Sequence, residues 1–93
     1  MRTFGEVKKY FEFQIEGDEK IYKIPLASSL PNAMMQMMKE ANDRGDGFSA
    51  QLIMLKKYMG DELVDEMSVD MADAILQAWG EASTEQGASA GES

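Results

Sequence analysis

The chain has 93 residues, which is enough for one small domain and too few for two. Nine basic and 17 acidic side chains give a formal net charge of −8, which argues against a nucleic-acid partner because phosphate neutralisation needs Lys and Arg. Cysteine and histidine are absent, which excludes disulfides, thiolate metal sites and the commonest general base, so we expect no cofactor and no enzymatic activity.

The first predicted element is a β-hairpin over about residues 9–25. Phe11, Phe13 and Ile15 alternate with polar residues, which is the period-two pattern of a half-buried strand. Turn formers follow at 17–19, and a returning strand over 20–24 is rich in β-branched and aromatic residues. Because a lone hairpin is marginal in water, one of its faces must pack on helices.

The first helix is predicted over about residues 29–42. Ser28 or Ser29 is placed to cap its amino end, and Pro31 would lie in the first turn. Apolar residues recur at helical spacing and form a stripe, namely Leu30, Ala33, Met34, Met37, Met38 and Ala41. Turn formers at 42–47 end this helix.

Two more helices are predicted, over about residues 49–59 and 68–81. Gly60 ends the first of them, and residues 61–66 form either a helical turn or a connector. Ser68 is the expected cap of the last helix, and Trp79 lies on the flank of its apolar face. That face is predicted to contain Met67, Met71, Ala74, Ile75 and Ala78.

Residues 82–93 contain no apolar side chain larger than alanine, so they are predicted to form a disordered acidic tail. We therefore expect an α+β domain over residues 1–81, with an N-terminal β-hairpin followed by about three helices. An almost all-helical bundle with a loosely attached hairpin is the alternative.

Four methionines within residues 34–38 are the most unusual feature of the chain. Flexible thioethers fill irregular cores, but the same flexibility makes an adaptable surface for apolar partner helices. Met35 lies off the main stripe, so part of this surface should be exposed. The candidate partner-binding residues are Met34, Met35, Met37, Met38, Leu52, Met54 and Trp79. For Trp79, a core position is the more common alternative.

Acidic side chains dominate the second half of the chain. No basic residue follows Lys57, whereas nine carboxylates do. The pairs Asp61/Asp65 and Glu62/Glu66 have the spacing of one helix face, but no motif for a hard cation completes them. We interpret these residues as a solvated acidic face and predict no metal site.

Both ends of the chain contain short segments that are familiar in combination. Near the start these are Phe-Glu-Phe-Gln-Ile-Glu-Gly at 11–17, Ile-Tyr-Lys-Ile-Pro at 21–25 and Ser-Ser-Leu-Pro at 28–31. Near the end they are Ile-Leu-Gln-Ala-Trp-Gly-Glu-Ala-Ser at 75–83 and Gly-Glu-Ser at 91–93. Together these segments cover roughly half of the chain, and in this order they resemble the tail assembly chaperones of long-tailed bacteriophages.

The resemblance implies a chaperone that binds the tape measure protein, a long and partly apolar helical chain, and keeps it soluble until tail-tube subunits polymerise around it. Such chaperones act in the host cell cytoplasm and are absent from the mature virion. The family often makes a second, longer product by ribosomal slippage, and the extension recruits the tail tube protein, which is therefore a further candidate partner. A second copy of this chain is another, because so small a core gains stability from self-association.

An acidic interaction protein, such as a DNA mimic or an inhibitor of a basic partner, is the alternative function. The carboxylates that follow Lys57 favour it. No apolar run approaches the roughly 20 residues that cross a bilayer, so we expect no membrane partner. We also expect no small-molecule substrate, because no nucleophile is paired with a base.

Overall fold

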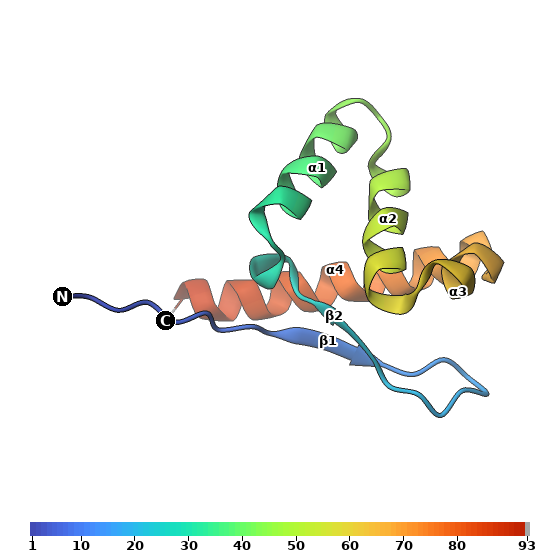
Figure 1. Cartoon of the computed structure of the whole chain (residues 1–93), viewed down its shortest axis with the longest axis horizontal. Helices are drawn as coiled ribbons and strands as arrows, with labels where there is room; N and C mark the ends of the chain where they lie inside the picture. Colours follow the sequence, from blue (N-terminus) through green and yellow to red (C-terminus); the bar gives the residue numbers. More distant parts are fainter. Residues whose placement is uncertain (93) are drawn as a thin grey trace.

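The computed structural model describes the backbone of residues 1–92 and the side chains of residues 1–84. Two strands come first and helices follow, so the predicted α+β class is confirmed (Figure 1). The elements are β1 (Tyr10–Phe13), β2 (Tyr22–Pro25), the 3₁₀ turn η1 (Ala27–Ser29), α1 (Asn32–Asp43), α2 (Gly47–Met59), α3 (Asp61–Glu66) and α4 (Val69–Glu92).

The hairpin has one apolar face and one charged face. Its strands pair antiparallel, with Phe11 opposite Ile24 and Phe13 opposite Tyr22. These four side chains point inward, and the rings of Phe13 and Tyr22 stack with centroids 5.7 Å apart. Glu12 and its cross-strand partner, Lys23, lie outside. The alternation predicted from the sequence is therefore confirmed.

The core lies between the inner face of the hairpin, α2 and α4. In Figure 1, α4 runs beside the hairpin, whereas α1 and α2 rise away from both as an antiparallel helical pair. Ile24 and Leu26 from the hairpin are completely buried, as are Met54 and Leu55 from α2. Because the hairpin supplies much of the core, the alternative of a loosely attached hairpin is wrong.

Helix α1 begins later than predicted, at Asn32 instead of about residue 29. A residue that precedes proline disfavours the helical region, and Leu30, before Pro31, is extended with ψ 147°. Neither serine caps α1, so that prediction is wrong. The Ser29 hydroxyl instead accepts a hydrogen bond from the Lys9 backbone N–H at 2.8 Å.

The connector between α2 and α4 is a short helix, α3, joined to α2 through Gly60. This glycine has a φ of +102°, a conformation that residues with a side chain rarely adopt. Its N–H donates a hydrogen bond to the Lys56 carbonyl, and α2 ends there. Val64 anchors α3 because its side chain is buried in the core. The predicted stop at Gly60 is confirmed.

Helix α4 starts as predicted but faces the core differently. The Met71 N–H donates to the Ser68 hydroxyl at 3.1 Å, which confirms the cap. The buried face consists of Ala72, Ile75, Leu76 and Trp79, whereas Met71 is 40% exposed. Ile75 and Met67 of the predicted face do pack inward, but the centre of the buried face is rotated by one residue, or about 100°. Trp79 sets this rotation, since its indole N–H donates to the buried Pro25 carbonyl at 2.8 Å.

The start of the predicted tail belongs to α4. The Ser83 hydroxyl accepts a hydrogen bond from the Ala27 backbone N–H at 3.0 Å, so this end of α4 is tied to η1. Disorder predicted from residue 82 is therefore wrong at Ala82, Ser83 and Thr84. Composition could not show that the Ser83 hydroxyl accepts a hydrogen bond from the Ala27 backbone N–H, which lies 56 residues earlier in the sequence. Residues 85–93, the rest of that predicted tail, lie outside the described side chains.

A carboxylate holds the hairpin turn together. Asp18 accepts a hydrogen bond from the Tyr22 hydroxyl at 2.6 Å and another from the Lys20 backbone N–H at 2.9 Å. These bonds lower the pKa of the Asp18 carboxyl below its ordinary value, with the Tyr22 bond as the larger cause. The same bond raises the pKa of the Tyr22 hydroxyl.

We predict an acid-dependent contribution of Asp18 to stability. A carboxyl whose pKa is lower in the folded chain stabilises the fold above its unfolded pKa, and this stabilisation is lost as the pH falls through the folded value. Asp18→Asn should therefore be less stable than the parent protein at pH 7, and the difference should shrink in acid. Urea midpoints measured from pH 7 to pH 2 test this, with the exposed Asp73→Asn as control; a difference that is independent of pH contradicts it.

Candidate protein-binding surface

Helix α1 presents the methionine cluster from the edge of the domain. Its main packing partner is α2. Part of the stripe predicted from the sequence packs inward, with Ala41 buried and Met34 and Met38 half-buried against the core, whereas Ala33 is exposed. Within residues 1–84 this helix is covered mainly from one direction, which leaves its other sides open to a partner.

The other two methionines of the cluster lie on either side of Met34 and Met38, although Met37 was predicted to lie within the stripe. Met35 is 38% exposed, and Met37 is half-buried without joining the core cluster. They are two residues apart, so they lie roughly 160° apart around the helix axis. Thioether surface is therefore available on both sides of the line along which α1 contacts α2.

Leu52 lies in a different place from the methionines. It lines a hollow of about 200 Å³ between α2 and the segment from α3 to the start of α4. This hollow, which we name the α2–α4 groove, is lined by Phe48, Leu52, Lys56, Val64, Asp65, Met67, Ser68, Val69 and Ala72. The methionine cluster and Leu52 therefore belong to two separate surfaces.

Met54 and Trp79 are not on any surface. Met54 has no exposed area and Trp79 only 6%, because both fill the space between the hairpin and the helices. Their burial overturns the prediction that they bind a partner and supports the alternative of a core position for Trp79. The spacing of apolar residues could not exclude Met54 from the candidate contacts. Because α2 is covered on two sides, most of its circumference is buried.

The exposed apolar residues that the sequence analysis did not consider as contacts include three on the helices next to turns or off the main stripes, Phe48, Ile53 and Val69. Phe48 is 38% exposed, Ile53 is 51% exposed and Val69 is 70% exposed. Each is next to a turn or off the main stripe of its helix, and a single exposed apolar residue carries no distinctive signal in a sequence. Only the contacts of α2 with α3 and α4 make Phe48 and Val69 neighbours.

Negative charge surrounds the α2–α4 groove. Residues 60–73 contain six carboxylates and no basic side chain, and all six carboxylates are exposed. Lys56 reaches Asp65 with 2.9 Å between Nζ and Oδ1, and this carboxylate raises the pKa of the Lys56 ammonium. The Asp65 carboxylate therefore balances the positive charge of Lys56. The other five carboxylates of residues 60–73 keep the surroundings of the groove acidic. Within residues 1–84, no group of three or more acidic side chains is arranged to hold a metal ion.

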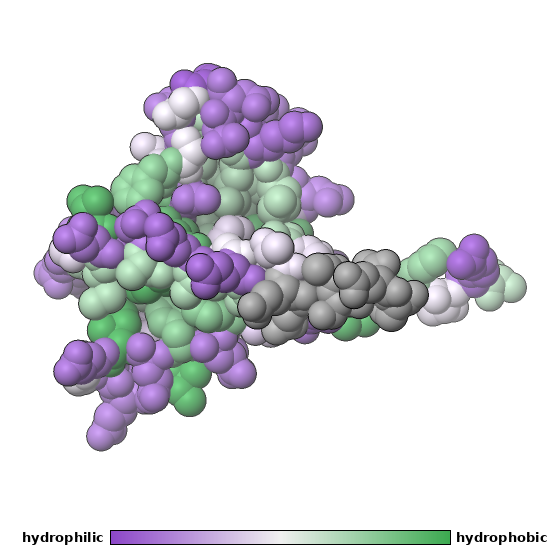
Figure 2. All heavy atoms as spheres, turned by 180° about the vertical axis from the view of Figure 1, so that it is seen from behind, coloured by the Kyte–Doolittle hydropathy of each residue, from purple (hydrophilic) through white to green (hydrophobic). Residues whose placement is uncertain are grey.

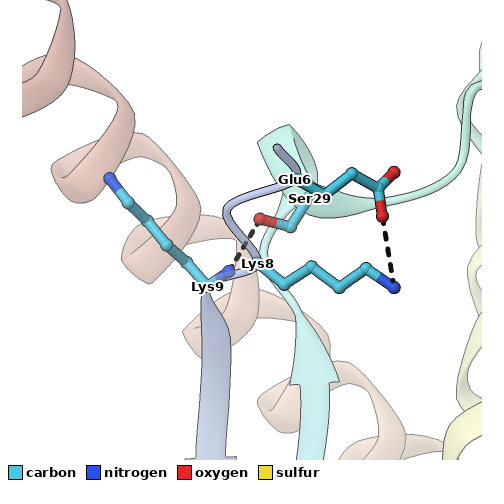
Figure 3. A network of polar contacts seen from close by, with 4 residues as sticks. All are labelled: Glu6, Lys8, Lys9 and Ser29. Carbon is cyan, nitrogen blue, oxygen red and sulfur yellow. Dashed lines mark hydrogen bonds and ion pairs between the residues drawn. The ribbon is translucent and has the colours of Figure 1, made fainter. Parts of the chain in front are cut away.

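A larger hollow, of about 390 Å³, lies where residues 6–10 pass the start of α1. Figure 3 shows its polar contacts: the Lys9 N–H bonds to Ser29, and Lys8 pairs with Glu6 at 3.6 Å. The Lys9 carbonyl also accepts the Leu26 N–H at 2.8 Å, which extends the hairpin pairing by one step. These contacts attach the N-terminal segment to η1 and contain no nucleophile paired with a base.

Comparisons with known protein families, with curated proteins and with solved structures found no match for this chain. Among the described residues, no helix combines the length and the apolar character needed to cross a membrane.

Proposed function

We propose that this protein is a tail assembly chaperone of a long-tailed bacteriophage, which binds the tape measure protein and keeps it soluble before the tail tube polymerises. The observation that carries the proposal is the open thioether surface of α1 on a chain of net charge −8. The resemblance of both chain ends to this family supports the same role. In this role the protein acts in the host cytoplasm and is absent from the mature virion.

The chemistry of α1 suits a long client with many unlike apolar stripes. Methionine side chains adapt to different surfaces because they are unbranched and polarizable. Single contacts of this kind are weak, but copies bound along one client combine their affinities. The excess of carboxylates then keeps coated clients apart by repulsion.

Co-expression with the candidate client tests the proposal. We expect the tape measure protein to be soluble and to co-purify with the parent chain. Met35→Ser combined with Met37→Ser should reduce both, because each serine removes about 1 kcal/mol of apolar contact from every bound copy. Soluble client is measured by centrifugation and quantitative gel analysis.

Ala33→Ser combined with Asn32→Ser is the matched control, since both residues are exposed on the same helix and neither is a methionine. The control should retain client solubility. The proposal fails if the client is equally insoluble with and without the parent chain, or if it is equally soluble with both double variants.

An acidic interaction protein remains the second candidate function, favoured by the exposed carboxylates of α3 and the start of α4. Binding of this kind would weaken steeply with salt. It would also be lost when Asp61, Glu62, Asp65 and Glu66 are changed to Asn and Gln, whereas the methionine double variant would bind normally.

A further inference from the structure

The first nine residues form an arm with exposed apolar side chains. Met1, Phe4 and Val7 project into solvent; Phe4 is 82% exposed and Val7 is 79% exposed. Their three-residue spacing would place them on one side of the segment if it binds in an extended conformation with three residues per turn. The N-terminal arm therefore exposes apolar side chains, although the Arg2 guanidinium lies 5.2 Å from the Phe4 ring centroid and Val7 borders the hollow beside the start of α1.

The α2–α4 groove is a second surface that exposes apolar side chains. Val64 and Ala72 form its buried floor, whereas Phe48 and Val69 are exposed at its rim. Its volume of about 200 Å³ is below the roughly 300–1,000 Å³ of ordinary ligand pockets, so it suits a few side chains of a peptide segment.

The arm and the groove have opposite charge. Residues 1–9 contain Arg2, Lys8, Lys9 and one carboxylate, which leaves a net charge of +2. Residues 56–73, which include Lys56 on the wall of the groove, contain two lysines and six carboxylates and have a net charge of −4. Attraction between them favours this pairing over contact between two grooves, which would bring like charges together.

The arm and the groove lie at opposite ends of the molecule. In Figure 1 the arm leaves β1 on the side away from α3, and its own contacts to η1 hold it there. Figure 2 shows the arm projecting at one end, whereas apolar side chains lie among hydrophilic ones at the other end, around α3 and the first turns of α4. The arm of one copy therefore points away from the groove of that copy.

We infer that the N-terminal arm of one copy binds the α2–α4 groove of a second copy. Phe4 and Val7 are about 9 Å apart in such an extended segment, and the groove wall from Phe48 to Lys56 spans about 12 Å of helix. Both side chains therefore enter the groove together. Arg2 and Lys9 then lie near the carboxylates of α3 and α4.

This contact joins unlike surfaces, so a bound pair retains one free arm, on the copy whose groove is filled, and one free groove, on the copy whose arm is bound. Such a head-to-tail contact builds rings or open chains of copies instead of a closed symmetric dimer. The average mass should therefore rise with protein concentration and fall with salt, because the charges involved are exposed.

Engineered cysteines test the contact directly, since the chain has none of its own. Phe4→Cys protein is mixed with Val69→Cys protein under mild oxidation, and the covalent dimer is measured by mass spectrometry. The matched control is Ile53→Cys, which is 51% exposed on α2 but does not line the groove. We expect at least tenfold more mixed dimer with Val69→Cys than with Ile53→Cys.

Light scattering across a concentration series provides the second measurement. The parent chain should associate at low salt, whereas a chain without residues 1–8 should remain monomeric. Equal crosslinking of the two cysteine positions, or a parent chain that is monomeric at every concentration, overturns the inference.

Discussion

Trp79→Ala should lower the free energy of unfolding by about 3–5 kcal/mol, the usual cost of removing a large aromatic ring from a core. Trp79 is 6% exposed, and its indole N–H donates to the Pro25 carbonyl at 2.8 Å. Its removal leaves both a cavity and a buried carbonyl without a donor. Because small domains are stable by only about 5–15 kcal/mol, this change takes a large part of the total.

Urea unfolding followed by circular dichroism measures this effect. Trp79→Phe separates the two contributions, because it keeps most of the ring volume and removes the N–H. We expect it to cost about 1–3 kcal/mol, the penalty of leaving the carbonyl unpaired in a buried site. A Trp79→Ala variant as stable as the parent chain would show that α4 does not pack on the hairpin through this residue.

Met54→Ala should be the second most damaging change, with an expected loss of about 2–5 kcal/mol for a buried methionine. Met54 has no exposed area and lies between the hairpin and the helical layer. Met35→Ala is the matched control, since the same residue type is 38% exposed on α1. That change should alter stability by less than about 0.5 kcal/mol.

The two methionine variants should also separate stability from binding. Met54→Ala lowers the urea midpoint, but its folded fraction should still bind a client through α1. Met35→Ala should leave the midpoint unchanged and weaken client binding. Equal stability losses for the two variants would contradict the burial difference on which the candidate surface rests.

Local chemistry was enough to predict most of the elements. Alternation at 11–16 predicted the strand and its inner face, because the two faces of a sheet differ in solvent exposure. Gly60 and Ser68 predicted helix ends correctly, since φ freedom and capping depend on neighbouring residues only. The late start of α1 could also have been predicted from the sequence, because Pro31 restricts Leu30 to an extended backbone.

The candidate surface was only partly predictable. Met35 was correctly expected to be exposed, because it falls off the apolar stripe of α1. Met54 and Leu52 could not be told apart, since both lie on apolar parts of α2 and the packing of two layers decides which is covered. The α2–α4 groove was not predictable, because its walls come from three helices.

The sequence by itself determined the order of the elements, the acidic charge and the absence of cysteine and histidine chemistry, because these depend on composition and on neighbouring residues. The tertiary structure alone decided which face of α4 is buried and which methionines remain open. Those outcomes depend on pairs distant in sequence, such as Trp79 with Pro25 and Ser83 with Ala27, whose hydrogen bonds set the rotation and position of α4.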